Sequence, residues 1–450
     1  MNKNEKTNVK GKLNNGGGHE RSRNSNGRAS INTKSKSKSG KHVDSRVAEI
    51  KKLSRKDSGN KKMQYDSEIE TGDARKNGDK PRRTKAEVKR NLKRIFALFL
   101  FILIAFLIMY TISLFKWYSI MKNVMKCQNS VILDSTGNVI AVIGENRIQK
   151  NVNFETVPDN LKNAYIAIED KTFNKHIGIN FKRTGGAILS YVTNKGAASY
   201  GGSTITQQLV KNITGENETK ISRKFTEWDR AIKTEILFSK DDILEAYFNV
   251  IYVGPNVYGV DMGAKYYFDK DVKDLSLAEC AFMAGLTHSP NSYNPFNGKN
   301  NSDLIKDRSI TVLNVMLQEG YINESEYNIA VQEVNDGLKF KQGDVEPEGS
   351  GIYSYMADAT INEVIQDLAD DKNISTSFAT NYLYLGGLKI NSTQNSDIQK
   401  IIENECSKNR YILKSNINKD VTSQAAMVII DQKKRICCGM CRRFRRKNIL

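Results

Sequence analysis

The apolar residues divide the chain into a long polar start, one apolar block and a patterned remainder. Residues 95–115, IFALFLFILIAFLIMYTISLF, form an unbroken apolar run of 21 residues without a charge. A helix of that length spans roughly 30 Å, the thickness of the hydrocarbon core of a bilayer. The run therefore predicts a single transmembrane helix over 95–115.

The pattern after this block changes to short alternating and helical periods. Residues 130–142, NSVILDSTGNVIA, alternate around a Thr-Gly-Asn turn and predict a β-hairpin. From about 157 to 335, apolar residues recur at spacings of three and four, which is typical of amphipathic helices. We expect Asp159 to cap the first of these helices. Residues 276–287 are apolar nearly all round and predict a buried helix, and 308–322 predict one that ends at Gly320.

These periods predict a mainly α domain over about 125–335. Beyond it, residues 336–431 have a mixed α/β pattern, with a predicted strand at 386–390 and a predicted helix around 397–405.

The charge of the chain is concentrated before the apolar block. Residues 1–94 contain 28 Lys and Arg against 11 Asp and Glu, which leaves a net charge of +2 for the other residues out of +19. This segment is poor in apolar residues, so we predict a disordered tail. Aromatic residues are nearly absent from this segment, with Tyr65 its one Phe, Tyr or Trp, so its charges lack aromatic interleaving. This argues against a nucleic-acid partner and favours anionic lipid.

The same asymmetry predicts the orientation in the cell membrane. An excess of Lys and Arg before the apolar run places the tail in the cytoplasm and the remainder outside. The run starts too late and is too long for a cleaved signal peptide, so we interpret it as an uncleaved signal-anchor.

Two stretches carry the first candidate chemistry. Glu169 opens EDKTFNKHIG at the end of a predicted helix, and residues 201–212 read GGSTITQQLVKN. Gly201 and Gly202 allow the backbone to approach a ligand closely. Thr204 and Gln207 have the spacing of a capping box, so a helix should start there. Its N-terminus together with Lys211 could hold a phosphate, with the amide side chains of Gln208 and Asn212 nearby.

A third stretch, RKFTE at 223–227, adds more charge. Arg223, Glu227 and Arg230 share one face of a predicted helix, and Lys224 lies beside them. The opposite face carries an apolar stripe made of Phe225, Trp228, Ile232 and Ile236. Two further stretches follow, KDDILEAYFNVIYVGPNVYGVDMGAKYYF at 240–268 and LSLAECAFMAGLTHSPNSYNP at 275–295.

Taken in order and with their spacing, these five stretches resemble the motifs of the peptidoglycan glycosyltransferases. These are the sugar-polymerising domains of bifunctional (class A) penicillin-binding proteins. The similarity covers about 130–325 continuously. It implies a lysozyme-like, mainly helical fold with a partly hydrophobic surface against the membrane.

The resemblance also implies a reaction. The substrate would be lipid II, a disaccharide-pentapeptide on undecaprenyl pyrophosphate, and the partner would be the growing glycan chain. Inversion at the donor carbon requires one base, for which Glu169 matches the family's residue. Glu227 matches the second glutamate, which we expect to orient the basic residues or a metal. The expected substrate-binding residues are Gln207, Gln208, Lys211, Asn212, Arg223 and Lys224.

A divalent cation, Mg²⁺, is the expected cofactor, although the resemblance does not identify its ligands. Other proteins of cell-wall synthesis are further expected partners. Two other classes of function remain open at this point. A glycan hydrolase would need an acid with a raised pKa, and a non-catalytic scaffold would need no site at all.

The resemblance breaks after the first domain. A class A protein continues into a transpeptidase with an S-x-x-K nucleophile. The S-x-x-K strings here lie in the basic tail or beside the apolar run, as at Ser35–Lys38 and Ser113–Lys116, where they cannot serve. Residues 336–431 still resemble the lead-in to a transpeptidase, so we expect transpeptidase activity to be absent.

Residues 432–450 then read QKKRICCGMCRRFRRKNIL. Codons can be chosen for Lys433–Arg446 so that they open with a run of adenines. Deleting one adenine from this run shifts the reading frame and gives KKGYVVGCVGGLG, a strand-like sequence suited to follow AAMVIID. We therefore predict a frameshifted tail that truncates the transpeptidase. The alternative is a Cys- and Arg-rich tail that binds zinc or lipid.

Overall fold

The computed structural model describes residues 84–144, 147–186, 202–218, 221–345, 353–408 and 426–442. Its first 83 residues, and with them almost all of the predicted disordered tail, lie outside this part. Helices predominate, as predicted, and the described residues from Thr84 onward belong to one compact unit.

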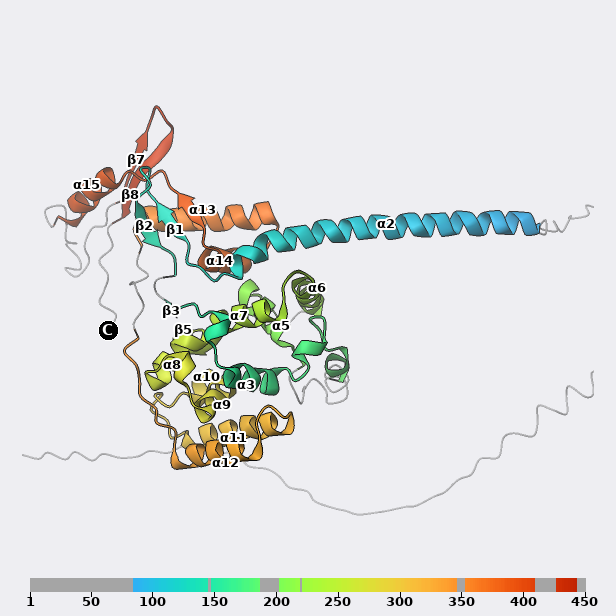
Figure 1. Cartoon of the computed structure of the whole chain (residues 1–450). Helices are drawn as coiled ribbons and strands as arrows, with labels where there is room; N and C mark the ends of the chain where they lie inside the picture. The colour runs from blue at the N-terminus through green and yellow to red at the C-terminus, as the bar shows by residue number, and fades with distance from the viewer. Residues whose placement is uncertain are drawn as a thin grey trace, which may run out of the picture. The chain divides into compact units, whose positions relative to one another are not determined.

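The first element is a long helix, α2 (Lys85–Val124), labelled with the others in Figure 1. It is longer at both ends than the predicted 95–115. It starts earlier because Thr84 and Glu87 form a capping box. An 18-residue window of α2 has a mean hydropathy of 2.9 and no buried residue. The helix is thus long and apolar enough to cross a membrane, while its last turns, including Trp117 and Met121, are buried against the rest of the unit.

The elements between α2 and residue 345 form the mainly helical part. The first group is β1 (Val131–Leu133), β2 (Val139–Val142), β3 (Ile148–Gln149), η1 (Phe154–Thr156), α3 (Asp159–Glu169) and η2 (Phe173–Lys175). The second group is α5 (Ile205–Thr214), α6 (Ile221–Leu237), α7 (Lys240–Val250), β4 (Tyr252–Gly254), β5 (Val257–Tyr258) and α8 (Val260–Phe268). The third group is η3 (Val272–Asp274), α9 (Leu277–Leu286), α10 (Pro290–Tyr293), α11 (Ser302–Gln318) and α12 (Glu324–Asp336).

Helix α9 lies at the centre of this part. Every residue from Ala278 to Leu286 is buried, which confirms the buried helix predicted from its apolar sequence. It packs against α3 and α11, and α12 lies beside α11 (Figure 1). The hydroxyl of buried Tyr165 on α3 donates to the carbonyl of Met283 at 3.1 Å. This packing fixes α3, which carries Glu169 at its end.

The remaining elements follow residue 352. They are α13 (Tyr355–Lys372), α14 (Thr376–Leu385), β6 (Lys389–Asn391), α15 (Ser396–Ser407), β7 (Ala426–Asp431) and β8 (Ile436–Arg442). Strand β6 pairs in parallel with β1, which itself pairs antiparallel with β2. A second small sheet has the order β3-β5-β4, and β7 pairs with β8 in a hairpin. The early hairpin is therefore tied to a segment far along the chain.

Several predicted elements are confirmed and others are wrong in detail. The hairpin at 130–142, the helix start at Thr204 and the helix around 397–405 all occur. The strand predicted at 386–390 is β6 at Lys389–Asn391, because Gly386 still belongs to the end of α14. Asp159 is not the cap: Pro158 holds that position and Asp159 is the first helical residue. Proline is compatible with this place because its fixed φ of about −65° matches the φ of −64° at Pro158. Helix α11 begins at Ser302 and not at 308, because its first turn packs Ile305 into the core.

Helix α6 has the predicted apolar stripe, and the stripe is partly turned outward: its first and last residues are exposed, whereas Trp228 and Ile232 are half-buried. Phe225 is 60% exposed and Ile236 is 56% exposed, whereas Glu227 and Thr234 on the charged side are buried. Contiguous exposed apolar patches are typical of surfaces that bind proteins, ligands or membranes.

Asp134 ties the first hairpin to the C-terminal segment. Its buried carboxylate accepts hydrogen bonds from the backbone N–H groups of Thr136 and Asn138, both at 2.9 Å, which shape the turn. It also accepts one from the Ser396 hydroxyl at the start of α15. The Ser396 hydroxyl first, and then that of Thr136, hold the pKa of Asp134 well below its usual value.

This lowered pKa predicts an acid-sensitive contribution to stability. A carboxyl whose pKa falls on folding stabilises the fold above its unfolded pKa of about 4, and the effect fades as the pH decreases further. Asp134→Asn should therefore lower the melting temperature at pH 7, and the deficit should shrink progressively below pH ~4. Thermal unfolding of both chains in detergent between pH 7 and pH 3 measures this. A deficit that is independent of pH would contradict the prediction.

Candidate active site

Glu169 is the last residue of α3, where the chain turns out of the helix at Asp170. A negative charge at a helix C-terminus is unfavourable, because the exposed carbonyl groups there are partly negative. Arg183 offsets this charge, since its Nη1 donates to the backbone carbonyl of Glu169 at 2.7 Å. A guanidinium group thus lies against the residue that the sequence identifies as the base.

Two side chains hold the Glu169 carboxylate in one orientation. Gln208 donates from Nε2 to one oxygen at 2.8 Å, and the Thr287 hydroxyl donates to the other, also at 2.8 Å. Gln208 is oriented in turn by the Tyr247 hydroxyl, which donates to its Oε1 at 3.2 Å. Burial, and then the charge of Glu169, raise the pKa of Tyr247 well above its usual value, so this hydroxyl remains a donor.

The neighbouring residue, Asp170, fixes the position of α5. Its Oδ2 accepts the backbone N–H of Ile205 at 3.1 Å and contacts His176 Nε2 at 2.7 Å. The backbone N–H of Gly178 donates to His176 Nδ1, so the ring proton is on Nε2 and points to Asp170. A carboxylate at the N-terminus of α5 is favourable because free N–H groups gather there. The ends of α3 and α5 are thereby locked together.

Helix α5 begins with the predicted capping box. The Thr204 hydroxyl accepts from Gln207 N–H, and Gln207 Oε1 accepts from Thr204 N–H at 2.9 Å. The other end of the Gln207 amide donates to Glu227 Oε1 at 3.3 Å. Gln207 therefore connects the start of α5 to α6. Gly201, one of the two predicted glycines, lies outside the described residues, whereas Gly202 lies within them.

Glu227 neutralises two cations of its own helix. It is 4% exposed, and Arg223 Nη1 donates to its Oε2 at 2.7 Å. Lys224 Nζ donates to its Oε1 and also to the Ser203 hydroxyl at 3.1 Å. The expectation that Glu227 orients the basic residues agrees with these contacts.

One cleft of about 400 Å³ brings most of the predicted residues together. It is lined by six of them: Glu169, Gln207, Gln208, Lys211, Asn212 and Glu227. The side chains of Lys211 and Asn212 are exposed and available to a ligand. Arg223 and Lys224 do not line the cleft, but they reach it through their contacts with Glu227. The cleft places a hydrogen-bonded carboxylate at one end and cations with amide donors along its wall.

Sequence reasoning did not name six residues that line this cleft, and two of these, Arg183 and Thr287, contact Glu169. The other four are Ser203, Ile251, Tyr252 and Pro290. Thr287 lies in the fifth motif, but nothing in its spacing distinguishes it from the core helix that it terminates. Arg183 follows Glu169 by 14 positions, outside every motif singled out. Both line the cleft and contact Glu169. Their roles depend on the fold bringing distant segments together, which no local pattern reveals.

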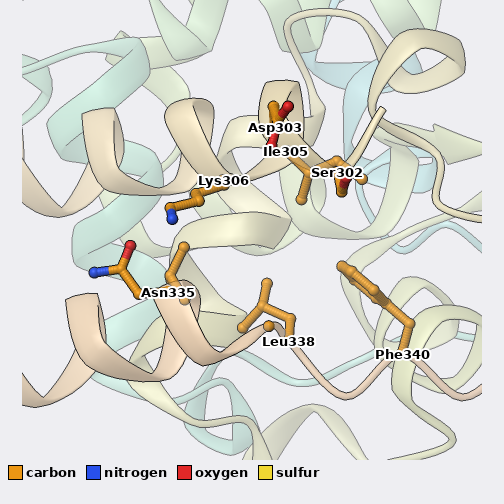
Figure 2. Close-up of a pocket in the computed structure, with 9 residues that line it drawn as sticks. Ser302, Asp303, Ile305, Lys306, Asn335, Leu338 and Phe340 are labelled. Carbon is orange, nitrogen blue, oxygen red and sulfur yellow. The ribbon is translucent and has the colours of Figure 1, made fainter. Parts of the chain in front are cut away.

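A second cleft, of about 310 Å³, lies away from this chemistry. Figure 2 shows residues from the start of α11, such as Ser302 and Lys306, on one side of it and Leu338 and Phe340 on the other. It contains none of the predicted site residues. Among the described residues, no group of three or more His, Cys, Asp or Glu side chains is placed to hold a metal ion.

Comparison with known proteins agrees with the motifs. Residues 136–317 match the family model described as Transglycosylase. The chain is 38% identical over 307 residues to penicillin-binding protein 1A of Clostridium botulinum strain Hall. This alignment covers 67% of this chain and 37% of that protein. It is 35% identical over 313 residues to penicillin-binding protein 1A of Clostridium tetani, covering 68% and 39%.

Among solved structures, penicillin-binding protein 1A from Haemophilus influenzae was found, with 22% sequence identity and a TM-score of 0.26. The comparison covers 61% of this chain and 28% of the Haemophilus chain. The chain spans about two fifths of the length of the two clostridial relatives. Residues 136–317 are a transglycosylase domain, as the five motifs predicted.

The pairing of Glu227 predicts a measurable contribution to stability. Glu227→Gln keeps the shape but leaves Arg223 and Lys224 without a charged acceptor. Because their side chains are 21% and 34% exposed, water can partly replace it. We expect a loss of about 1–2 kcal/mol in the free energy of unfolding. Denaturant unfolding in detergent measures this, with the exposed Glu155→Gln as a matched control. Equal effects of the two substitutions would contradict the prediction.

Proposed function

We propose that this chain is a membrane-anchored peptidoglycan glycosyltransferase that polymerises lipid II into β-1,4-linked glycan strands. The proposal rests on one observation above all. The cleft of the transglycosylase domain holds Glu169 with both carboxylate oxygens fixed, and the cation and amide donors of α5 lie in the same cleft. A displacement that needs one base and a stabilised anionic leaving group suits this arrangement.

In the proposed reaction, Glu169 acts on the acceptor. The 4-hydroxyl oxygen of the acceptor sugar attacks the anomeric carbon of the growing chain, and the bond from that carbon to the lipid pyrophosphate breaks. The hydroxyl proton passes to Glu169, and inversion converts an α-linked donor into a β-linked product. The hydrogen bonds from Gln208 and Thr287 support this role, because they aim the carboxylate before the substrate arrives.

The departing pyrophosphate needs positive charge. Lys211 and Asn212 are exposed on the wall of the cleft, and Arg183 also lines it. Arg223 and Lys224 add charge behind Glu227. Charge-assisted hydrogen bonds of this kind strengthen as negative charge accumulates on the leaving oxygen.

The carboxylates of the cleft do not fit a Mg²⁺ site built from protein ligands alone. The oxygens of Glu227 are engaged by Arg223, Lys224 and Gln207, and those of Glu169 by Gln208 and Thr287. We propose instead that a Mg²⁺ ion enters with the substrate pyrophosphate, since Mg²⁺ commonly binds phosphates with few protein carboxylates. No step above depends on it.

Two features support an anchored enzyme facing a bilayer. Helix α2 is long and apolar enough to cross a membrane, and the excess of Lys and Arg before it favours a cytoplasmic N-terminus and an external domain. Besides Phe225 and Ile236 of α6, Ile177 and Phe181 are exposed apolar side chains, at 59% and 67%. We propose that these side chains enter the interface, where a lipid-linked substrate resides. Other proteins of cell-wall synthesis are further proposed partners.

The base is tested by polymerisation of labelled lipid II with the full chain in detergent and Mg²⁺. Glu169→Gln should lower the rate by about 10²–10⁴-fold, because an amide cannot accept the proton. The Glu155→Gln chain should match the wild type.

Replacing Mg²⁺ with EDTA in the same assay tests the cation. A hydrolase would release muropeptides from finished glycan, and a folded wild-type chain that makes no polymer would refute the proposed function.

The apolar surface is tested by fluorescence, since the sequence contains two tryptophans, Trp117 and Trp228. Trp228 lies on the apolar stripe of α6 and contacts Phe225 with ring centroids 5.1 Å apart. In proteoliposomes with brominated acyl chains, part of the wild-type emission should be quenched, and this part should disappear in Trp228→Phe. Quenching of Trp228 by aqueous iodide and not by brominated lipid would show that the stripe faces water.

A further inference from the structure

Arg230 lies one turn beyond Glu227 on α6 but outside the cleft. Its guanidinium donates to Glu216 Oε2 at 2.8 Å and lies over two aromatic rings, 5.5 Å from the centroid of Trp117 and 5.6 Å from that of Phe378. Trp117 belongs to α2, and Phe378 to α14. Arg230 therefore joins four parts of the fold: α2, α6, α14 and the loop after α5.

Glu216 carries this contact toward the site. It lies in the loop between α5 and α6, and its second carboxylate oxygen accepts from the Ser375 hydroxyl at 3.0 Å. The backbone of the same loop holds Arg223: Nη1 donates to the Glu216 carbonyl at 3.4 Å, and Nε donates to the Glu218 carbonyl. Arg223 then donates to Glu227 in the cleft. An unbroken series of contacts thus leads from Arg230 to Glu227.

The same elements are connected by a second set of contacts. Trp117 Nε1 donates to Thr234 Oγ1 of α6 at 3.0 Å, and Lys233 Nζ donates to the Ser113 hydroxyl of α2 at 2.7 Å. From α14, Asn381 Nδ2 donates to the backbone carbonyl of Asn212 at 3.2 Å. The helices that carry the candidate site are therefore packed directly against α2 and α14, and α14 lies outside the matched residues 136–317.

We propose that the Arg230–Glu216 pair is a positioning device. Through it, the end of α2 and helix α14 hold the loop after α5, and thereby Arg223 and Glu227, in the geometry that the reaction needs. Arg230 does not touch the substrate. The inference rests on the proposed glycosyltransferase function for its kinetic consequence, but not for its structural one.

The chemistry of the pair supports a positioning role. The side chains of Arg230 and Glu216 are 16% and 21% exposed, so their attraction is screened less than on an open surface. A guanidinium can stack on two rings while its N–H groups reach a carboxylate, which an ammonium does less well. Removing the charge of Arg230 releases Glu216 from one of its two partners, and the loop carbonyls that hold Arg223 gain freedom.

The kinetic test is a double-mutant cycle on lipid II polymerisation by the full chain in detergent. Arg230→Met, which keeps an apolar stem, should lower kcat/KM by roughly 5- to 30-fold. If Arg230 acts through Arg223, the double variant Arg223→Gln/Arg230→Met should be within about twofold of Arg223→Gln alone. Arg230→Lys should recover part of the activity. Thr311→Ala, an exposed threonine of α11 that does not line the cleft, is the matched control and should equal the wild type.

A structural readout makes the test independent of activity. Amide hydrogen exchange of Arg230→Met should rise within 215–227 and stay at the wild-type level in α11 and α12. Glu216→Gln should give the same local pattern if Arg230→Met folds poorly. The proposal would be overturned if the decreases in kcat/KM of the two single variants simply multiply in the double variant. It would also be overturned if hydrogen exchange rises evenly through the domain. If the wild type makes no polymer, the proposed function fails, and hydrogen exchange alone decides the positioning role.

Discussion

The buried charge of Glu227 is the interaction on which the rest of the site depends. Helix α6 turns its apolar stripe partly outward, so its charged side enters the protein. A buried carboxylate without partners would cost several kcal/mol, and the structure supplies Arg223, Lys224 and Gln207. Because Gln207 also caps α5, the requirement to neutralise one glutamate fixes two helices relative to each other and places their cations beside a common cleft.

The same principle orders the opposite side of the cleft. Asp170 is buried and is satisfied by the start of α5 and by His176, which fixes where α3 ends. Glu169, the next residue back, is then held by Gln208 and Thr287 from two other helices. Each carboxylate of the site is thus oriented by groups on different elements. Such preorganisation reduces the rearrangement that a reaction requires, because the carboxylate is already held in one orientation.

The predictions succeeded where local physics decides the outcome. The capping box at Thr204, the turn of the first hairpin and the all-apolar helix α9 follow from short-range hydrogen bonds and composition. The motifs also named six residues that share one cleft. The direction of the α6 stripe was not foreseeable, since periodicity gives two faces and does not say which one meets solvent or lipid. Arg183 and Thr287 were missed because they reach Glu169 only through tertiary packing.

The packing of α14 shows why a family match does not delimit a working site. The match ends at residue 317, yet Phe378 and Tyr382 of α14 are buried among residues of α2, α5 and α6. Asn123 of α2 donates to the Tyr382 hydroxyl at 3.2 Å, so α2 and α14 also contact each other. A domain cut at residue 317 would lack α14. The apolar side chains of α2, α5 and α6 that pack against α14 would then be exposed to water. The helices that carry Arg223 and Lys211 would then lose the surface that holds them. In this chain the site therefore depends on helix α2, the matched domain and the segment that follows it, taken together.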